Sequence, residues 1–572
     1  MLALLVTAGH ALAGFPFVWN VGSDNDSFMR IVEVRDLLGG QNWFDLRQVR
    51  MGLEGGFTMH WSRLVDAPLA LLFLLGERLT GSAANAAAFA QVVWPTLMFA
   101  AALFLILRLA RVLGGLQTRL PALVVGVSAL YGVQVFRPGM IDHHNFQFVV
   151  LLGATLALLA ARERPLWGAV AGAACALMLG IGMETAPHVA ALCLFAGADF
   201  LFRGEKAAAG AAAFGLGLGF AGAAIMAGTV PWGSWNVVAC DAFSLPQATL
   251  ALTGGLGLAL AATIPGRDRM AVRAAALVLL GAACAALLLW RFPECLADPY
   301  AGLDERLKRF WLGAVGEAQP AWRVAAQTPA AAAAAYVTPF IALVVLGHGL
   351  LREGVSRARL LVFLLLGVSF AVSLWQVRGM YIALPLAAVA LAGFVARVRL
   401  GGRPLAMALA WIVSIDAAWA GAAALAFRPS IAATSAAGSV AAGTGNCEAM
   451  ADYASLARQP PTRVLAVSNL GAAILAWTPH SVLAGPYHRN IEGNLAGLDA
   501  WMAEPDDARR MLEAEGAGLV AWCAGNSEAD VMAAAPEGLA ASLRDGRAPA
   551  WLEPVQETRQ SPLKLFRIIP AR

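Results

Sequence analysis

Long apolar runs separated by short polar loops dominate the first three quarters of the chain. An apolar run of about 20 residues is long enough to cross a membrane as a helix. We count thirteen such spans, at about 2–19, 86–107, 119–136, 145–161, two flanking GMETAPH, 207–229, 247–264, one ending at Trp290, 332–350, two flanking QVRGM, and 404–427. The shorter run PLALLFLLGERL predicts a helix at the membrane interface. The pattern therefore predicts an α-helical polytopic membrane protein.

The pattern changes after about residue 428, where the apolar runs become short. RVLAVS, SVLAGP and GLVAWC predict buried strands, and DDARRMLEAEG predicts a helix between them. We therefore expect a transmembrane domain over residues 1–427 and a small extramembrane α/β domain over residues 428–572. Cys447 and Cys523 both lie in the second domain and either form a disulfide in an oxidising compartment or stay free.

The loops between the spans fall into two classes. Fifteen arginines, from Arg108 to Arg403, lie in loops on one side, which the positive-inside bias assigns to the cytoplasm. The other side collects the two long loops and the segments DHH, GMETAPH and QVRGM. With an odd number of spans and a cytoplasmic amino terminus, the C-terminal domain lies outside. We expect a multi-pass protein of the cell inner membrane whose C-terminal domain is periplasmic.

Composition narrows the class further. Hydrophobic residues make up 59% of the chain and charged residues 14%, against about 25% charged in soluble domains. The seven cysteines include no CxxC pair, so neither a zinc site nor a thioredoxin-like motif is indicated. No basic stripe is interleaved with aromatic residues, which argues against a nucleic-acid partner.

Polar residues gather at the outer mouths of the predicted spans, although a charge within a bilayer span costs several kcal/mol. These residues are Asp24 and Asp26 after the first span, Asp142-His143-His144 before the fourth, Glu317 in the long loop after the ninth, and Arg378 in QVRGM. Carboxylates with one or two imidazoles are typical ligands of Mg²⁺ or Mn²⁺. Arginine opposite a metal is a usual partner of a phosphate.

Each of these positions also has a simpler structural interpretation. Asp24 and Asp26 could form a turn or cap the helix FMRIVEVRDLL, and Asp142 could cap the fourth span. Glu317 could be an ordinary loop carboxylate, and Arg378 an anchor at the interface. Glu184 and His188 lie one helical turn apart and are interpreted as a pair with each other, so we leave them out of the site.

The order of these segments resembles the catalytic subunit of oligosaccharyltransferases, in the GT-C class of membrane glycosyltransferases. DNDSFMRIVEVRDLL, followed by a WFD segment, is similar to the first acidic motif of that family. RPGMIDHH resembles the second motif, with its Asp-x-His pair. AVGEAQPAW is similar to the S-V-S-E-H-Q-P segment, and VRGMYIALPLA resembles the R-[FY]-x-x-x-x-x-P segment. Thirteen spans followed by an external domain also agree with a GT-C-like architecture.

The resemblance implies a role for each matching residue. Asp26, Asp142, His144 and Glu317 would hold the divalent metal, Mn²⁺ or Mg²⁺, and Asp26 and Glu317 would also lie near the acceptor. Arg378 would hold the lipid-linked phosphate, with Arg137 as a second arginine for it. The implied reaction is the inverting transfer of a sugar or oligosaccharide from a polyprenyl phosphate or polyprenyl diphosphate at the outer face of the membrane.

The C-terminal domain departs from the family pattern. The family carries W-W-D-Y-G where this chain has VSNLG, residues 467–471, so a tryptophan pocket that reads the hydroxyl of a glycosylation sequon is unsupported. The acceptor is therefore a protein, or else a glycolipid or polysaccharide. Two other classes stay open, a transporter or lipid flippase and a non-catalytic assembly protein. A transporter would place its polar residues along a path at mid-bilayer depth rather than at the outer mouths.

Overall fold

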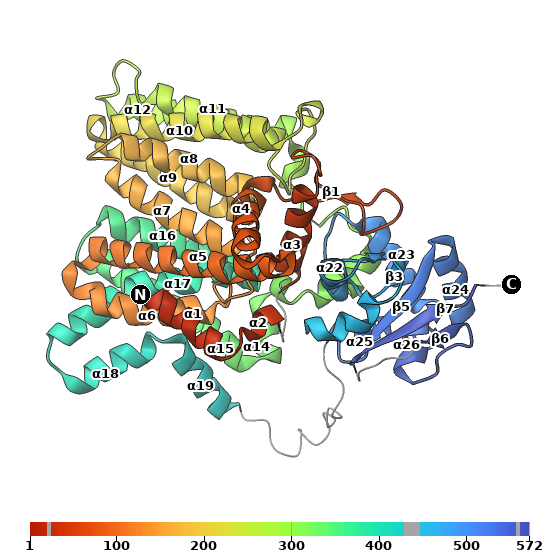
Figure 1. Cartoon of the computed structure of the whole chain (residues 1–572). Helices are drawn as coiled ribbons and strands as arrows, with labels where there is room; N and C mark the ends of the chain where they lie inside the picture. The colour runs from red at the N-terminus through yellow and green to blue at the C-terminus, as the bar shows by residue number, and fades with distance from the viewer. Residues whose placement is uncertain (20–23, 299, 428–446, 556–560, 571–572) are drawn as a thin grey trace.

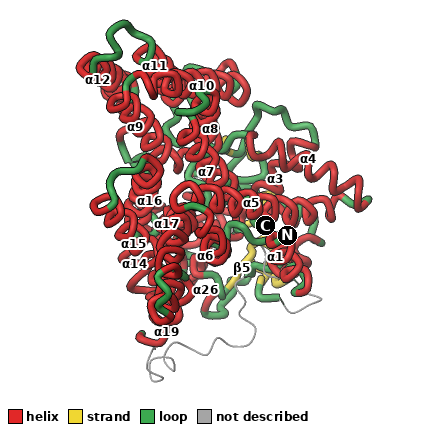
Figure 2. The backbone as a smooth tube through the Cα atoms, turned by 90° about the vertical axis from the view of Figure 1, so that its left-hand side faces the viewer, coloured by secondary structure: helices red, strands yellow, loops and turns green. Residues whose placement is uncertain are grey.

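The computed structural model describes the whole chain apart from residues 20–23, 299, 428–446, 556–560 and 571–572. Helices packed side by side form the larger part, and a smaller α/β part lies at one end of them (Figure 1). Viewed from the helical side, the strands of the smaller part lie behind the helices (Figure 2). The predicted boundary between residues 427 and 428 adjoins the segment 428–446 and so lies at the edge of the described residues.

The larger part contains the helices α1 (Leu2–Leu12), α2 (Pro16–Trp19), α3 (Asn25–Leu38), α4 (Arg63–Thr80), α5 (Ala83–Gly114), α6 (Arg119–Gly132), α7 (His144–Ala160), α8 (Leu166–Ile181), α9 (Ala186–Arg203), α10 (Glu205–Thr229), α11 (Leu245–Ala261), α12 (Met270–Ala286), α13 (Glu305–Phe310), α14 (Ala321–Gln327), α15 (Pro329–Arg352), α16 (Arg357–Trp375), α17 (Met380–Leu400), α18 (Pro404–Val413) and α19 (Asp416–Ala426). Between α3 and α4, β1 (Arg47–Gln48) pairs antiparallel with β2 (Phe57–Thr58).

Seven helices in the described part of the chain are long and apolar enough to cross a membrane, or eight if the bent pair α18 and α19 is one span. The chain is thus a membrane protein, but thirteen spans are not confirmed. Several predicted spans are broken or short. The first divides into α1 and α2 at Phe15, whose φ is 49°, the third ends at Gly132 after 14 residues, and the last bends by 84°.

An ion network fixes α3 against α4 beside the bundle. Arg30 donates to Asp66 at 2.7 Å and to Glu33 at 3.2 Å, while Arg63 donates to Asp66 at 3.0 Å. All four side chains are buried, so each charge depends on its partners for compensation. The Arg30 guanidinium also lies 4.3 Å from the ring centre of Trp61, which connects the network to the loop before α4.

The C-terminal part is built on a five-stranded sheet of order β4-β3-β5-β7-β6. Its elements are α21 (Ala454–Ala457), β3 (Arg463–Leu465), α22 (Ser468–Trp477), β4 (Ser481–Val482), α23 (Ile491–Met502), α24 (Pro505–Ala514), β5 (Ala517–Cys523), α25 (Ser527–Met532), α26 (Leu539–Arg544), β6 (Leu552–Pro554) and β7 (Leu563–Ile568). β3 is parallel to β4 and β5, whereas β7 is antiparallel to β5 and β6. The predicted strands and helix are confirmed, and Cys447 is bonded to Cys523.

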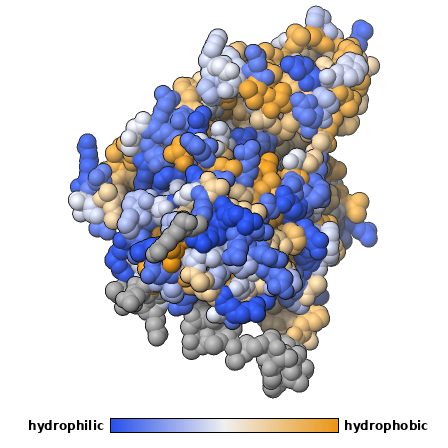
Figure 3. All heavy atoms as spheres, turned by 90° about the vertical axis from the view of Figure 1, so that its right-hand side faces the viewer, coloured by the Kyte–Doolittle hydropathy of each residue, from blue (hydrophilic) through white to orange (hydrophobic). Residues whose placement is uncertain are grey.

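One apolar core joins the two parts. Phe28 and Val32 of α3, Leu307 and Trp311 of the loop between α12 and α14, and the core of the C-terminal sheet belong to the same buried cluster. Seen from the C-terminal end, hydrophilic side chains cover most of the surface, and hydrophobic ones gather at the top, over α10–α12 (Figure 3). The end of the molecule that carries the C-terminal part is therefore polar, as expected for a face in water.

Candidate active site

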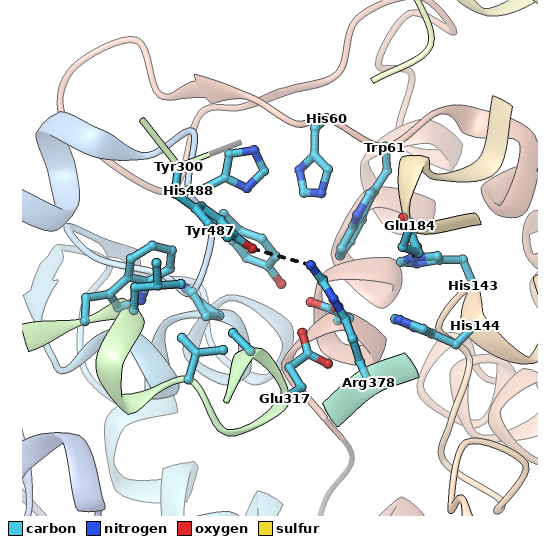
Figure 4. A pocket seen from close by; sticks show the side chains of 16 residues that line it. His60, Trp61, His143, His144, Glu184, Tyr300, Glu317, Arg378, Tyr487 and His488 are labelled. Atoms are coloured by element: carbon cyan, nitrogen blue, oxygen red, sulfur yellow. Dashed lines mark hydrogen bonds and ion pairs between the residues drawn. The ribbon is translucent and has the colours of Figure 1, made fainter. Parts of the chain in front are cut away.

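Segments from seven regions of the chain meet in one pocket of about 90 Å³ (Figure 4). The described residues that line it are Asp26, His60, Trp61, His143, His144, Glu184, Tyr300, Trp311, Leu312, Val315, Glu317, Ala318, Arg378, Pro486, Tyr487 and His488. The structure thus brings together four predicted site residues, Asp26, His144, Glu317 and Arg378. The pocket lies between the helical part and the C-terminal part, which contributes residues 486–488.

The start of α3 places Asp26. Asp24 caps this helix by accepting from the Ser27 amide at 2.7 Å, so the capping interpretation holds for Asp24. Asp26 lies in the first turn and lines the pocket. The Ser27 hydroxyl accepts from the Ile141 amide at 3.0 Å, and this bond joins the segment of Asp26 to the segment of Asp142. The two acids, 116 positions apart, are therefore neighbours.

Asp142 lies between two imidazoles. Its carboxylate contacts His143 Nδ1 and His144 Nδ1, and ligand atoms of these three residues lie within 4.8 Å of one another. Among the described residues, no side chain caps α7, so the interpretation of Asp142 as its N-cap is wrong. His144 Nε2 is buried and has no hydrogen-bond partner in the described part of the chain. This arrangement of oxygen and nitrogen atoms can hold a divalent metal ion.

The acids at this site repel one another in the absence of a cation. Burial, and then the charges of Asp142 and Glu317, raise the pKa of Asp26 well above its usual value. Burial also opposes the charge of Asp142, but His143 and His144 hold the pKa of Asp142 well below its usual value. A divalent cation would compensate all three carboxylates together, so the residues present fit a metal site.

Glu317 is held close to the start of α17. It lies in a single turn, Gly316–Ala318, within the loop that follows α12. The next residue but one, Gln319, closes this turn by donating to Gly313 O at 3.0 Å and to Val315 O at 2.9 Å. The Gln319 carbonyl accepts from the Val377 amide at 2.9 Å, one residue before Arg378. The loop carboxylate and the arginine are therefore positioned by the same contact.

Arg378 is oriented from both sides. Its Nε donates to Gln376 Oε1 at 2.8 Å, and its Nη2 donates to the Tyr300 hydroxyl at 3.4 Å, the bond drawn in Figure 4. Arg378 also lines a second cavity of about 270 Å³, together with the apolar side chains of Val372, Trp375 and Ile382. A guanidinium at the junction of a polar and an apolar cavity suits a phosphate that carries an apolar chain.

Arg137 does not belong to this pocket. Its guanidinium lies 5.2 Å from the ring centre of Phe17 and 4.9 Å from that of Tyr131, and it is absent from the described lining residues. The chain turns at Gly139, with φ 106°, between Arg137 and the Asp142 segment. This turn directs Arg137 toward α2 and α6, so the structure does not place it beside Arg378.

Glu184 belongs to the pocket, contrary to our expectation. Glu184 contacts His143 Nε2, and His188 lies 2.8 Å from the Ser369 hydroxyl, so the predicted pairing of Glu184 with His188 is wrong. Glu184 occupies the mouth of α9 just as Asp142 occupies the mouth of α7. The position of an acid directly before an apolar helix was the signal in the sequence that could have identified Glu184 as a site residue.

Sequence reasoning also missed five aromatic and imidazole groups, His60, Trp61, Tyr300, Tyr487 and His488. The Tyr487 hydroxyl donates to the Asn25 carbonyl at 3.1 Å and so reaches the residue before Asp26. The rings of Trp61 and Tyr487 lie 5.5 Å apart at 87°, an edge-to-face contact. These groups come from loops whose positions depend on the docking of the C-terminal part.

The segment VSNLG forms the start of α22, and the carboxylate of Glu528 accepts hydrogen bonds from its donors. The buried Glu528 carboxylate accepts from the Ser468 amide at 3.1 Å, from the Ser468 hydroxyl at 3.0 Å and from the Asn469 amide at 2.8 Å. The donors at this helix terminus are thus satisfied within the protein. They are not available to read a hydroxyl group of an acceptor.

Comparisons with known proteins agree with this architecture. No protein-family model and no curated protein matches the chain. Among solved structures, it is similar to the apo oligosaccharyltransferase of Archaeoglobus fulgidus, with 13% identity and a TM-score of 0.65 over 93% of this chain and 71% of that chain.

Two further structures of the Archaeoglobus fulgidus protein are also similar. The AglB complex with an inhibitory peptide and a dolichol-phosphate gives 13% identity and a TM-score of 0.60, over 97% of this chain and 72% of that chain. The complex with Zn and sulfate gives 13% identity and a TM-score of 0.56, over 91% of this chain and 67% of that chain. At this identity the likeness shows the fold, and it confirms the resemblance to oligosaccharyltransferases drawn from the sequence.

Proposed function

We propose that this chain is a membrane glycosyltransferase that moves a sugar or oligosaccharide from a polyprenyl-phosphate-linked or polyprenyl-diphosphate-linked donor to an acceptor, with inversion and in a metal-dependent manner. One observation carries the proposal. An acidic and imidazole cluster, a loop carboxylate and an oriented arginine meet in one pocket beside an apolar cavity. The fold shared with an oligosaccharyltransferase supports the same reaction class.

Asp26, Asp142, His144 and Glu317 are the residues that would hold the metal, Mn²⁺ or Mg²⁺. Carboxylates neighbouring one another and a buried imidazole nitrogen without a partner in the described chain support this set. A bound divalent cation would supply Lewis-acid and electrostatic stabilisation of the charge that develops on the leaving phosphate. The related protein that was crystallised with Zn and sulfate also supports a metal site.

The donor would lie across both cavities. Val372, Trp375 and Ile382 offer an apolar wall for the first part of the polyprenyl chain. Arg378 would bind the phosphate, and the half-buried His60 lines both cavities beside it. The dolichol-phosphate in the related AglB complex is consistent with this kind of ligand.

Asp26 or Glu317 would orient the acceptor and accept its one proton as the bond to the sugar forms. Burial and the neighbouring acids raise the pKa of Asp26, and a bound cation would favour its ionised form, which can accept a proton. The loop that carries Glu317 lines the pocket, and its closure over bound substrate would exclude water from the reacting groups.

Two acceptor classes are supported by different observations. The inhibitory peptide in the related AglB complex favours a protein acceptor. The closure of the VSNLG terminus by Glu528 favours a hydroxyl-bearing glycolipid or polysaccharide over a sequon peptide. A deletion strain analysed by mass spectrometry of envelope glycoproteins and glycolipids, side by side, distinguishes the two classes.

We also propose that the pocket faces the periplasm across the cell inner membrane. The disulfides Cys240–Cys295 and Cys447–Cys523 are in the loops beside the pocket and in the C-terminal part, and disulfides persist in oxidising compartments. The arginine-rich loops, such as the one with Arg357 and Arg359, follow the ends of spans away from the pocket, as the positive-inside bias requires.

The proposal is tested with the full-length protein in liposomes that contain a lipid-linked sugar donor. Metal-dependent release of lipid phosphate should be lost in Asp142→Ala and in Glu317→Ala. Glu294→Ala, an exposed carboxylate of the same loop, is the matched control and should keep full turnover. Turnover at the wild-type rate in Asp142→Ala and Glu317→Ala, under EDTA, would overturn the proposed mechanism.

A further inference from the structure

Three cavities meet at a single side chain of the C-terminal part. The pocket of about 90 Å³, the apolar-walled cavity of about 270 Å³ and a third, open groove of about 460 Å³ all include His488, and no other described residue lines all three. The groove is bounded by residues 56–58, 302–303, 488–489 and 491. His488 therefore marks the point at which the reaction pocket opens to the outside.

We propose that this groove binds the saccharide part of the lipid-linked donor. The inference rests on the proposed function and specifies where the donor leaves the reaction pocket. The donor has an apolar chain, an anionic phosphate and a polar saccharide. The apolar-walled cavity and Arg378 match the first two parts, and the groove is the remaining space that shares His488 with both cavities.

Asp241 holds the two groove-lining residues His488 and Arg489 in place and compensates the charge of Arg489. His488 Nε2 lies 2.7 Å from Asp241 Oδ2, and Arg489 binds both Asp241 oxygens through Nε and Nη2, each at 2.7 Å. Such a bidentate pair fixes the planes of both side chains. Within the described part of the chain, Nδ1 of His488 has no hydrogen-bond partner and can make a further bond, and the ring centres of His488 and His60 lie 4.6 Å apart (Figure 4).

This chemistry favours a neutral, hydroxyl-rich ligand. Asp241 compensates the guanidinium of Arg489, so the groove offers oriented polar groups rather than a free cation for an anionic ligand. Backbone at Gly56 and Gly302 and the exposed Thr58 add further polar groups along the groove. The ring of Phe57 is stacked on Tyr487 at 6.0 Å and 20°, which supports the floor beside the reaction pocket.

The test fills the groove without touching the phosphate site. Full-length protein is immobilised and exposed to undecaprenyl phosphate and to lipid-linked saccharides extracted from membranes of the native host, and the retained lipids are quantified by mass spectrometry. The wild type should retain the lipid-linked saccharides at least about tenfold better than undecaprenyl phosphate. Thr58→Trp should abolish this preference and leave the retention of undecaprenyl phosphate unchanged. Thr263→Trp, an exposed threonine after the opposite end of α11, is the control.

A second variant tests whether the ion pairs of Asp241 are needed for binding in the groove. Asp241→Asn removes the charge that fixes His488 and Arg489, and it should reduce the preference in the same direction as Thr58→Trp. The proposal is overturned if Thr58→Trp retains the wild-type preference, or if it raises the KM for the acceptor while donor retention is unchanged, since the groove would then hold the acceptor. If the wild type retains neither undecaprenyl phosphate nor any lipid-linked saccharide, the proposed function itself fails.

Discussion

Trp311 connects the position of Glu317 to the C-terminal part, and we predict that Trp311→Ala releases the loop. Trp311 is 5% exposed and follows α13, whose Leu307 is fully buried in the shared core. The Trp311 ring also lines a small cavity with Ser468, Trp501 and Glu528 of the C-terminal part. Glu317 follows six residues later, so the docked tryptophan determines where the turn with Glu317 begins.

The magnitude follows from the burial of the side chain. Replacing a buried Trp by Ala costs about 3–5 kcal/mol. At about 1.4 kcal/mol for each factor of ten, docking of the loop becomes weaker by a factor of roughly 10² to several times 10³. A loop that is mostly docked in the wild type would then be undocked for a large part of the time, and kcat should fall accordingly because Glu317 leaves the pocket.

The assay combines hydrogen exchange of the peptide that covers residues 303–318 with turnover in liposomes. Trp311→Ala should lose protection in that peptide and lose most of kcat, whereas Trp311→Phe should retain much of both. Arg306→Gln removes the exposed ion pair with Asp499 and serves as the control, because exposed pairs contribute little. Wild-type protection and wild-type kcat in Trp311→Ala would refute the reasoning.

Three further predictions concern stability and donor binding. Burial and Asp66 raise the pKa of Glu33 to about 8, above its usual 4.5, so its stabilising contribution is full below about pH 4.5 and is lost as the pH rises to about 8. The Tm should therefore fall between about pH 5 and 8, and Glu33→Gln should flatten this dependence. Cys447→Ser with Cys523→Ser opens a bond between residues 76 positions apart and should lower the free energy of unfolding, measured with denaturant, by up to about 4–5 kcal/mol; an unchanged midpoint would contradict a stabilising bond. Arg378→Lys loses the planar fork and should raise the donor KM about tenfold or more with the fold intact by circular dichroism.

The sequence predicts the helical class and the members of the site better than it predicts the helices themselves. Apolar length identifies where chain can lie in a membrane, but it carries no signal for a bend. The run 404–427 is long enough for one span and yet bends by 84° between α18 and α19, where Ser414 and Asp416 interrupt its apolar residues. By contrast, α1 ends at Leu12, just before Gly14 and Pro16, which are helix-stop residues that apolar length alone does not take into account.

The candidate site was predictable where a charge lies at the mouth of an apolar run. Asp26, His144, Glu317 and Arg378 follow this rule, and the structure brings all four to one pocket. Arg137 follows the rule too, but the turn at Gly139 takes it to Phe17 and Tyr131. The position of a charged residue at the end of an apolar helix is thus predictable from hydropathy. The direction of its side chain depends on local backbone turns.

The groups from the C-terminal part could not be found in this way. Tyr487 and His488 follow the short predicted strand SVLAGP rather than a membrane span, and their position depends on long-range contacts with Asn25 and Asp241. Such contacts join residues more than two hundred positions apart, and no periodicity of a single sequence records them.

The contact of Asp241 with residues 488 and 489 has a consequence for the evolution and engineering of this protein. Because each half of the chain supplies one side of this contact, a C-terminal part grafted from a relative would bring its own loop and leave Asp241 facing a foreign partner. Chimeras should therefore recover activity only when position 241 and the grafted loop are exchanged together, and natural variants should change at both places in step.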